Sequence, residues 1–248
     1  MLRSLNQLIG YTVRASDGPI GHVHEFYFDD HSWGIRYMVA DIGKWIKGRK
    51  VLLAPAAFEQ PVWDERTFPV AVTKAQVEGS PDIDTDQPIV RQIQARLHRH
   101  YGWEMYFAEE GLMGRASPEI SIQEENANKN GKPFDPHLRT TRVVTGHHVE
   151  ATDGLIGHVS DFIADDEKWV IRYLVVDTRH LLPRKQVLLV PSWTRHISWE
   201  AHTIYVDLSR AQIGNGPSFD SAAPVNRQVE ERVYDYYGRP KYWHSKSG

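Results

Sequence analysis

The chain has 248 residues, a formal net charge of −3 and no cysteine. Its 41% hydrophobic and 25% charged residues are typical of a globular protein with a buried core. The charge argues against a general nucleic-acid or membrane-surface binder, and the lack of cysteine excludes disulfides, thiol catalysis and thiolate metal sites. No apolar run approaches the roughly 20 residues that span a bilayer. Polar Asn6 and Gln7 interrupt any signal-peptide core, so we expect a cytoplasmic protein.

The chain repeats itself at a spacing of 136 residues. Asp17–Val23 (DGPIGHV) returns as Asp153–Val159 (DGLIGHV). Residues 10–107 align with 146–243 without a gap, and 36 of the 98 aligned positions are identical. An ungapped match of this length predicts an internal duplication, although two copies do not make a solenoid.

Each copy begins with a predicted hairpin turn. An Asp-Gly pair stands between two β-like runs, and a type I′ turn needs the positive φ that glycine accepts. Three residues after that glycine, a second one lies within a strand, where glycine marks a bulge or a close backbone approach. We interpret these residues as structural turns rather than as a ligand cradle: Asp17, Gly18, Gly21, Asp153, Gly154 and Gly157.

Short strands separated by turns follow in each copy. Ile35–Asp41 (IRYMVAD) and Ile171–Asp177 (IRYLVVD) alternate with a period of two and are apolar on both faces, so we expect strands covered on both sides. The pattern predicts about six strands per copy, as in a small sandwich or barrel. The predicted fold is therefore mainly β: two small β-barrels, closed or partly open, from an internal duplication, each followed by an amphipathic α-helix.

The helix of each copy is predicted at about 88–101 and about 224–237. Apolar residues recur at helical spacing, a proline precedes them, and Gly102 and Gly238 stand where a C-terminal cap is expected. The apolar stripe of each helix must be buried. We hypothesise that the two helices help to dock the two copies, each on the barrel of the other.

The helices and the segments after them supply a candidate interaction surface. The first helix is basic and has no acid, whereas the second is slightly acidic. Aromatic tails follow at Tyr101–Phe107 and Tyr237–Trp243, and aromatic side chains are enriched in interface cores. The alternative is that these tails fold back onto a barrel. The candidate surface comprises Arg91, Arg96, Arg99, Trp103, Tyr106, Tyr237 and Trp243.

Residues 108–138, between the copies, are polar and rich in Asn, Gly and Pro, which is typical of a linker. Ser117 and Pro118 favour the start of a short helix within it. The predicted organisation is a first domain at 1–107, the linker at 108–138, and a second domain at 139–248.

No catalytic constellation stands out in the sequence. It contains no P-loop, HExxH or GxSxG motif, and the strand-end Asp41 and Asp177 have no nameable base partner. We therefore expect no enzyme and no cofactor. His22 and His24 share one strand face and could hold a metal, but Ser160 replaces His24 in the second copy, so we favour polar histidines.

Taken in order, these motifs resemble the PRC-barrel family. The family pattern is a glycine–valine strand, a dG..iG.v turn, an acidic turn, a yvvvd strand and a vliP strand. These stand here at Gly10/Val13, Asp17–Val23, Asp29-Asp30, Tyr37–Asp41 and Val51–Pro55, and again 136 residues later. The resemblance covers roughly 10–80 and 146–216, and it implies a small closed β-barrel.

The family resemblance also implies a role in binding and assembly rather than in chemistry. The family includes the cytoplasmic domain of the photosynthetic reaction centre H subunit and the C-terminal barrel of a ribosome-maturation factor. This chain departs from both, because it has neither the transmembrane helix of the first nor the N-terminal domain of the second. Neither specific function therefore carries over intact.

Two functions from different classes remain open. The first is a non-enzymatic adaptor that binds a protein partner in the assembly or regulation of a macromolecular complex, for example membrane-associated electron-transport machinery. The second is an RNA or ribonucleoprotein binder that uses the basic face of Arg91–Arg99. A small-molecule or metal sensor at His22 and Asp29 is a weaker third reading. The sequence is also compatible with a homodimer.

Overall fold

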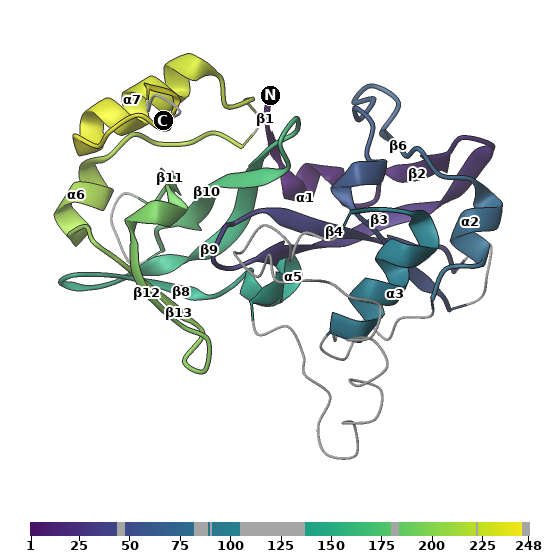
Figure 1. Ribbon diagram of the computed structural model, residues 1–248. Helices are drawn as coiled ribbons and strands as arrows, with labels where there is room; N and C mark the ends of the chain where they lie inside the picture. The colour runs from purple at the N-terminus through teal and green to yellow at the C-terminus, as the bar shows by residue number, and fades with distance from the viewer. Residues whose placement is uncertain are drawn as a thin grey trace.

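The structure is a computed structural model that describes residues 1–43, 48–81, 89, 91–104, 137–179, 184–221 and 223–244. It is mainly β, with one sheet in the first half (residues 1–104) and one in the second half (residues 137–244), lying side by side (Figure 1). The predicted mainly β fold is confirmed. The described strand pairings close neither sheet into a barrel.

The first-half sheet is open and curved around its core. Its strand order is β5 (Lys50–Leu53), β4 (Ile35–Asp41), β3 (Gly18–Asp29), β2 (Thr12–Ala15) and β6 (Thr67–Pro69). Neighbours pair antiparallel except β2 and β6, which run parallel. The other elements of this half are β1 (Leu2–Ser4), α1 (Leu5–Leu8), η1 (Pro55–Ala57), α2 (Lys74–Glu78) and α3 (Arg91–Tyr101).

The second-half sheet has the same plan. Its strand order is β11 (Gln186–Leu189), β10 (Val170–Asp177), β9 (Gly154–Asp165), β8 (His148–Ala151), β13 (Thr203–Val206) and β12 (Thr194–Ser198). The remaining elements are β7 (Leu138–Thr140), α5 (Thr141–Val144), η3 (Pro191–Trp193), α6 (Arg210–Asn215), α7 (Arg227–Tyr237) and η4 (Tyr242–His244). Each first-half element has a counterpart that begins 136 residues later, except that β10 begins one residue earlier than this spacing.

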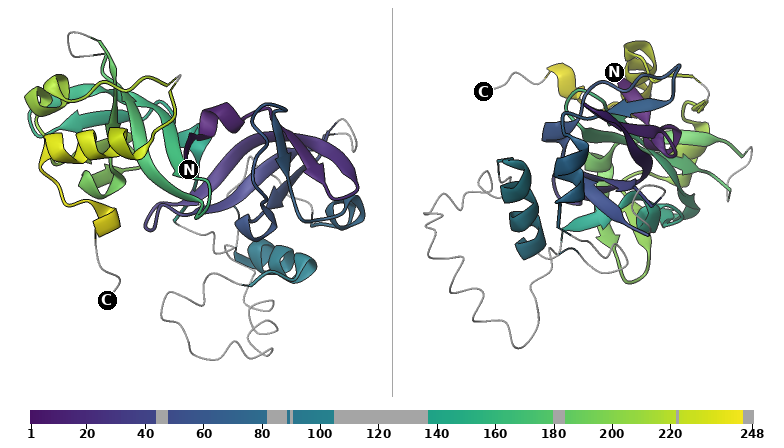
Figure 2. Two further views of the ribbon diagram at one scale, coloured as in Figure 1. Left: turned by 90° about the horizontal axis from the view of Figure 1, so that it is seen from above. Right: turned by 90° about the vertical axis from the view of Figure 1, so that its right-hand side faces the viewer.

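Each half donates its first strand to the sheet of the other half. Strand β1 pairs antiparallel with β9, and strand β7 pairs antiparallel with β3. The registers match at the 136-residue spacing: Leu2 faces Asp165, and Leu138 faces Asp29. The N-terminus accordingly lies where the two sheets meet (Figure 2). The sequence analysis did not predict this exchange.

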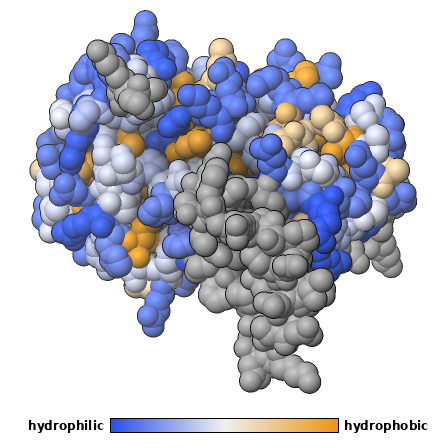
Figure 3. Space-filling model, viewed as in Figure 1, coloured by the Kyte–Doolittle hydropathy of each residue, from blue (hydrophilic) through white to orange (hydrophobic). Residues whose placement is uncertain are grey.

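The two halves also share one hydrophobic core. A single cluster of buried side chains includes residues from β3 and β4 as well as from β9 and β10. Trp169, from the second half, lies with its ring centroid 4.8 Å from that of Phe58 and 5.4 Å from that of Phe68, both in the first half. Burial of such aromatic area is a main source of stability. The face shown in Figure 3 is mostly hydrophilic, with small separate hydrophobic areas.

Helices α3 and α7 pack on the sheet of their own half. The Tyr37 hydroxyl on β4 lies 2.9 Å from His98 Nε2 on α3, and the Tyr173 hydroxyl on β10 donates to Glu230 on α7 at 3.0 Å. The hypothesis that each helix docks on the other copy is therefore wrong. The strands, rather than the helices, are exchanged, because the back face of each central strand is itself apolar and takes the helix of its own half.

Both helices begin three residues after the proline expected to start them. The side chain of Asn226, not a proline, caps α7 by accepting the backbone N–H of Val229 at 3.0 Å. Val225 lies before the helix and pairs with Leu2 instead of joining the apolar stripe. The predicted caps at the other end are confirmed, since Gly102 and Gly238 have φ values of 71° and 62°.

The Asp-Gly turns differ from the predicted type I′ geometry. Ala15 pairs with Gly18, so the two loop residues are Ser16 and Asp17, and of these residues Gly18 alone has a positive φ. Asp17 has a different role: its Oδ1 accepts the backbone N–H of Lys74 at 2.9 Å, where α2 begins. Its counterpart Asp153 holds the first residue of α6 in the same way, at 2.7 Å.

The glycines inside β3 and β9 mark the predicted close approach. A Cβ at Gly21 would collide with the backbone oxygen of Asp41, and one at Gly157 with that of Asp177. These two glycines therefore let neighbouring strands cross closely.

The predicted linker as far as residue 136, including the short helix at Ser117, lies outside the described residues. Among the described helices, none combines the length and apolar character needed to cross a membrane.

Candidate functional site

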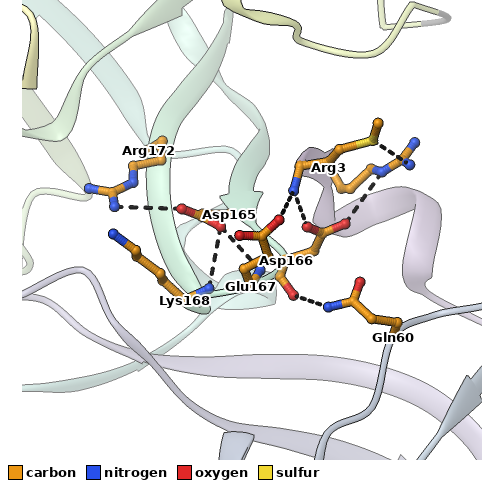
Figure 4. Close-up of polar contacts among 8 residues, drawn as sticks. Arg3, Gln60, Asp165, Asp166, Glu167, Lys168 and Arg172 are labelled. Carbon is orange, nitrogen blue, oxygen red and sulfur yellow. Dashed lines mark hydrogen bonds and ion pairs between the residues drawn. The ribbon is translucent and has the colours of Figure 1, made fainter. Parts of the chain in front are cut away.

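The site lies where the two halves meet, and its frame is built from paired polar contacts. Figure 4 shows one side of this frame. Arg3 on β1 lies with its Nε 3.5 Å from Asp166 Oδ2 of the second half and stacks over Trp63 of its own half at 4.3 Å. Gln60 of the first half donates to the backbone oxygen of Asp166 at 3.2 Å. The turn after β9 is thus held by the first half.

The other side repeats these contacts with the halves interchanged. Arg139 on β7 donates through Nε to Asp30 Oδ2 of the first half at 2.9 Å and stacks over Trp199 at 4.4 Å. His137 Nδ1 also lies 2.9 Å from Asp30 Oδ1. One arginine on each exchanged strand therefore joins the two halves, through an ion pair with a carboxylate of the half whose sheet it enters and cation–π stacking on a tryptophan of its own half.

Two backbone hydrogen bonds complete the junction at its centre. The N–H of Ile35 donates to the oxygen of Trp169 at 2.7 Å, and the N–H of Ile171 donates to the oxygen of Trp33 at 2.8 Å. Both tryptophans stand in tight turns, with φ values of 60° and 52°. Both tryptophans serve packing: Trp33 stacks on Phe28, and Trp169 contacts Phe58 and Phe68 of the first half.

A groove of about 400 Å³ opens beside this junction, on the first-half side. We call it the Trp103 groove. It lies between the turn before β4, the η1 turn, the end of α3, and the β9–β10 turn of the second half. Its lining residues are Ser32, Gly34, Ile35, Arg36, Ala54, Pro55, Ala56, His98, Trp103, Glu104, Lys168, Trp169 and Val170. Apolar and aromatic walls thus surround two cationic residues and one acidic residue.

Trp103 forms one wall because the chain turns back directly after α3. Its backbone N–H donates to the oxygen of His98 at 2.9 Å. Its ring stacks on Tyr101 with centroids 4.2 Å apart and meets the edge of His98 at 5.9 Å. The indole is half-buried.

His98 is a neutral hydrogen-bond bridge in this wall. Its Nδ1 lies 2.7 Å from the backbone oxygen of Glu104, which can only accept, so Nδ1 carries the proton. Nε2 then accepts from the Tyr37 hydroxyl at 2.9 Å. Burial lowers the pKa of His98, which agrees with the neutral form. Both ring nitrogens are therefore engaged.

The corresponding place in the second half is filled by the chain itself. The ring of Tyr242, on η4, covers Arg172 at 4.5 Å, and the ring of Trp243 covers Arg227 at 4.2 Å. Arg172 is the counterpart of Arg36, which lines the Trp103 groove.

A buried carboxylate anchors this second-half tail. Glu230, 2% exposed, accepts the hydroxyl of Tyr242 at 2.8 Å and that of Tyr173 at 3.0 Å, and it pairs with Arg227 at 2.8 Å. Burial raises the pKa of Tyr242 to about 12, so its hydroxyl keeps the proton that it donates. The first half has Gln94 in place of Glu230. Gln94 is fully buried, and its Oε1 lies 3.4 Å from the Tyr37 hydroxyl.

The predicted interaction residues are spread over several places. Trp103 lines the groove, whereas the exposed Arg96 and Arg99 on α3 do not. Tyr237 and Trp243 are half-buried against their own half, at centroid distances of 4.9 Å from Trp193 and 5.1 Å from Tyr234. The Arg91 side chain and Tyr106 lie outside the described residues.

Sequence reasoning missed Arg36 and His98 as lining residues. The signal for Arg36 was present, because an Ile-Arg-Tyr triplet is identical in both copies, but it was taken only as part of a strand. The acidic residues of the metal hypothesis have other roles. Asp29 accepts the backbone N–H of Ser32 at 2.7 Å, and Asp30 holds Arg139. Within the described ranges, no group of three or more His, Asp or Glu side chains is arranged to hold a metal.

No protein-family model matches this chain, and no curated protein matches it. Any role of the Trp103 groove must therefore be argued from its own side chains.

Proposed function

We propose that this chain is a non-enzymatic adaptor that binds a partner protein in the Trp103 groove and so serves the assembly or regulation of a macromolecular complex. One observation carries the proposal: the lining of the groove combines Arg36 and Lys168 with the aromatic rings of Trp103 and Trp169, drawn from both halves. A volume of about 400 Å³ lies within the roughly 300–1,000 Å³ of small-ligand sites. Aromatic walls with a cation are typical of interface centres.

The polar groups of the groove support binding rather than catalysis. Ser32 donates its hydroxyl to Asp29 at 2.8 Å, and the same carboxylate oxygen accepts the backbone N–H groups of His31 and Ser32, so this contact shapes the turn. His98 uses both ring nitrogens in hydrogen bonds to Tyr37 and to the backbone of Glu104. A general acid or base must reach a reacting atom, and these groups already serve the fold.

We further propose that the two halves descend from one duplicated PRC-barrel-like unit. The 36 identities in 98 aligned positions and the common element spacing support this origin. In this proposal each unit completes its sheet with the strand of the other, and the adaptor acts in the cytoplasm. The resemblance favours partners in membrane-associated electron-transport machinery.

The adaptor proposal is tested by blocking the groove in the full-length chain. Ala56 is exposed and lines the groove, so Ala56→Arg fills it without touching the core. Its exposed counterpart in the second half, Ser192, gives the matched control Ser192→Arg. In affinity capture from native extract, we expect a specific protein retained by the wild type and by Ser192→Arg and lost with Ala56→Arg. Equal retention by all three chains would reject the groove as the binding site.

RNA binding is the second candidate because Arg96 and Arg99 are exposed on α3. If RNA were the partner, capture would depend on salt and on these two arginines. The double variant Arg96→Ala/Arg99→Ala would then lose binding, whereas Ala56→Arg would keep it. Unchanged capture by the double variant, together with loss in Ala56→Arg, favours the adaptor.

A further inference from the structure

We infer that the contact between Arg139 and Trp199 is an acid-sensitive latch, and that its release at mildly acid pH lets the exchanged strand β7 leave the first-half sheet. This inference goes beyond the proposed adaptor function and does not depend on the Trp103 groove. It rests on a row of four side chains beside each exchanged strand, which the two halves build from different residues.

The first-half row consists of two aromatic rings and two arginines. The Arg3 guanidinium lies over the Trp63 ring at 4.3 Å. The Tyr11 ring meets the Trp63 ring edge-on at a centroid distance of 5.6 Å. The Arg66 guanidinium in turn lies over the Tyr11 ring at 5.2 Å. Because a guanidinium stays charged and a phenol stays neutral in mild acid, the same cation–π contacts hold this row at neutral and at acid pH.

The second-half row has histidines in its last two places. Arg139 lies over the Trp199 ring at 4.4 Å, as in the first half. His147 takes the place of Tyr11, with its ring centroid 5.9 Å from that of Trp199. His202 takes the place of Arg66, with its ring centroid 4.9 Å from that of His147. The row therefore keeps its order, while two of its members become imidazoles that can take up a proton.

His147 cannot take up a proton in place without a cost. It is 3% exposed, and its Nε2 has no hydrogen-bond partner among the described residues. The charged and titratable groups that face it are His202 from the β12–β13 turn, His148 from β8 and Arg139 from β7. No acidic side chain of the described ranges acts on its pKa, which burial and these three groups lower from 6.5 to about 4.

A proton on His147 therefore favours any motion that brings its ring to water. The rings that pack against it, those of Trp199 and His202, belong to one turn, because the His202 N–H donates to the Trp199 oxygen at 3.3 Å. This turn is tied to β8 by the His148 N–H, which donates to the His202 oxygen at 2.8 Å. When the turn lifts, Trp199 moves away from Arg139 and the latch opens.

Strand β7 is more weakly held than its counterpart β1, so the loss of one contact matters more to it. Leu138 and Arg139 of β7 are both half-buried. In β1, by contrast, Leu2 is 7% exposed and pairs with Val225 as well as with β9. The part of the molecule that acid loosens first is therefore the pairing of β7 with β3.

Asp30 is a further anchor of β7, and one of its partners opposes the release. Arg139 Nε lies 2.9 Å from Asp30 Oδ2, and His137 Nδ1 lies 2.9 Å from Asp30 Oδ1. A charged His137 holds β7 more tightly in acid. Its side chain is 54% exposed, so this pairing is screened by solvent and contributes little, whereas His147 is buried. We therefore expect the release to prevail.

Two equivalent backbone amides report on the two exchanged strands. The N–H of Asp30 donates to the His137 oxygen at 2.8 Å, and the N–H of Asp166 donates to the Met1 oxygen at 2.9 Å. Each of these hydrogen bonds breaks when the exchanged strand leaves its sheet. Hydrogen exchange of the full-length chain, followed by NMR and corrected for intrinsic rates, measures the protection of both amides.

Protection at Asp30 should fall with pH, and protection at Asp166 should not. An exposed His147 binds its proton with the ordinary pKa of 6.5 and the buried ring with a pKa of about 4, so the opening equilibrium should rise about twentyfold from pH 7 to pH 5. Protection at Asp30 should decrease by the same factor. Constant protection at Asp30, or an equal fall at both amides, would overturn the inference without any variant.

Two double variants interchange the rows. His147→Tyr/His202→Arg gives the second half the residues of the first and should remove the pH dependence at Asp30. The matched variant Tyr11→His/Arg66→His should make protection at Asp166 pH-dependent, to a smaller degree because β1 has the additional pairing of Leu2. A fall at Asp30 that persists in His147→Tyr/His202→Arg would show that another group titrates, and the latch would be rejected.

Discussion

The two halves share their element order and differ where the last helix meets the sheet. In the second half, buried Glu230 gathers two tyrosine hydroxyls and Arg227, and the tail that follows covers Arg172. In the first half, Gln94 stands in place of the carboxylate beside Tyr37, and Arg36 lines the Trp103 groove. The comparison teaches that the same contact between helix and sheet can be built around a buried carboxylate or around a buried amide.

The junction between the halves is reciprocal but unequal in packing. Trp169 inserts among Phe26, Phe58 and Phe68 of the first half, whereas its counterpart Trp33 is half-buried and stacks on Phe28 of its own half. Trp169→Ala should therefore lower the free energy of unfolding by about 3–5 kcal/mol. Trp33→Ala should cost about 1–2 kcal/mol. Urea unfolding monitored by circular dichroism measures both. Equal losses would break this comparison.

His147 makes the second half sensitive to acid pH at a position where the first half has Tyr11. His147, 3% exposed, takes the position of Tyr11, and its Nε2 has no hydrogen-bond partner among the described residues. Burial, with His202, His148 and Arg139 nearby, lowers its pKa from 6.5 to about 4. Between these values the unfolded chain binds the proton and the native chain does not, so stability falls as the pH drops from about 6.5 to about 4.

The loss over this pH range should be on the order of 2–3 kcal/mol. His147→Tyr restores the residue of the first half and removes the titrating group. The difference in unfolding free energy between the two chains, measured by urea titration from pH 7 to pH 4, should therefore change by that amount. A difference that stays constant with pH would show that His147 titrates normally in the native state.

The anchoring carboxylate can be converted to its first-half counterpart. Glu230→Gln removes the charge that holds Arg227 and two hydroxyls, so we expect a loss of about 1–2 kcal/mol. The tail should also loosen, which increased hydrogen exchange at Tyr242 and Trp243 would report. The reverse variant, Gln94→Glu, is the matched control at the equivalent place and should not protect those residues. Unchanged exchange in Glu230→Gln would mean that ring stacking alone holds the tail.

The smallest expected effect concerns the two arginines of the exchanged strands. Arg139 Nε lies 2.9 Å from Asp30, whereas Arg3 Nε lies 3.5 Å from Asp166, and both stack on tryptophan. Partly exposed pairs contribute little, so Arg139→Ala should cost about 1 kcal/mol and Arg3→Ala somewhat less. Thermal unfolding of both variants measures the two losses of stability. A larger loss for Arg3→Ala than for Arg139→Ala would refute the prediction.

Local chemistry made part of this fold predictable from sequence. The alternation in Ile35–Asp41 and Ile171–Asp177 indicated strands covered on both faces, and both are buried on both faces. Gly102 and Gly238 indicated helix ends through their tolerance of positive φ. In each case the residue itself carries the structural requirement.

The strand exchange and the groove could not be predicted from such local sequence patterns. Leu2–Ser4 and Leu138–Thr140 are only three residues long, and nothing in them specifies which of two similar sheets they join. The groove depends on side chains far apart in sequence, such as Arg36, Trp103 and Trp169. Predicting the groove would require knowing that the two halves meet at their β-turns. The exchange of first strands brings these turns together, and it leaves no periodic pattern in the sequence.

The central claim is that the halves form one unit through exchanged strands and a common core. It is tested by inserting a protease site between residues 120 and 121 of the full-length chain and cleaving it under native conditions. The account predicts that the two fragments elute together at the size of the uncut 28.5 kDa chain and unfold in one transition. Fragments that separate in native buffer, or that unfold independently, would contradict it.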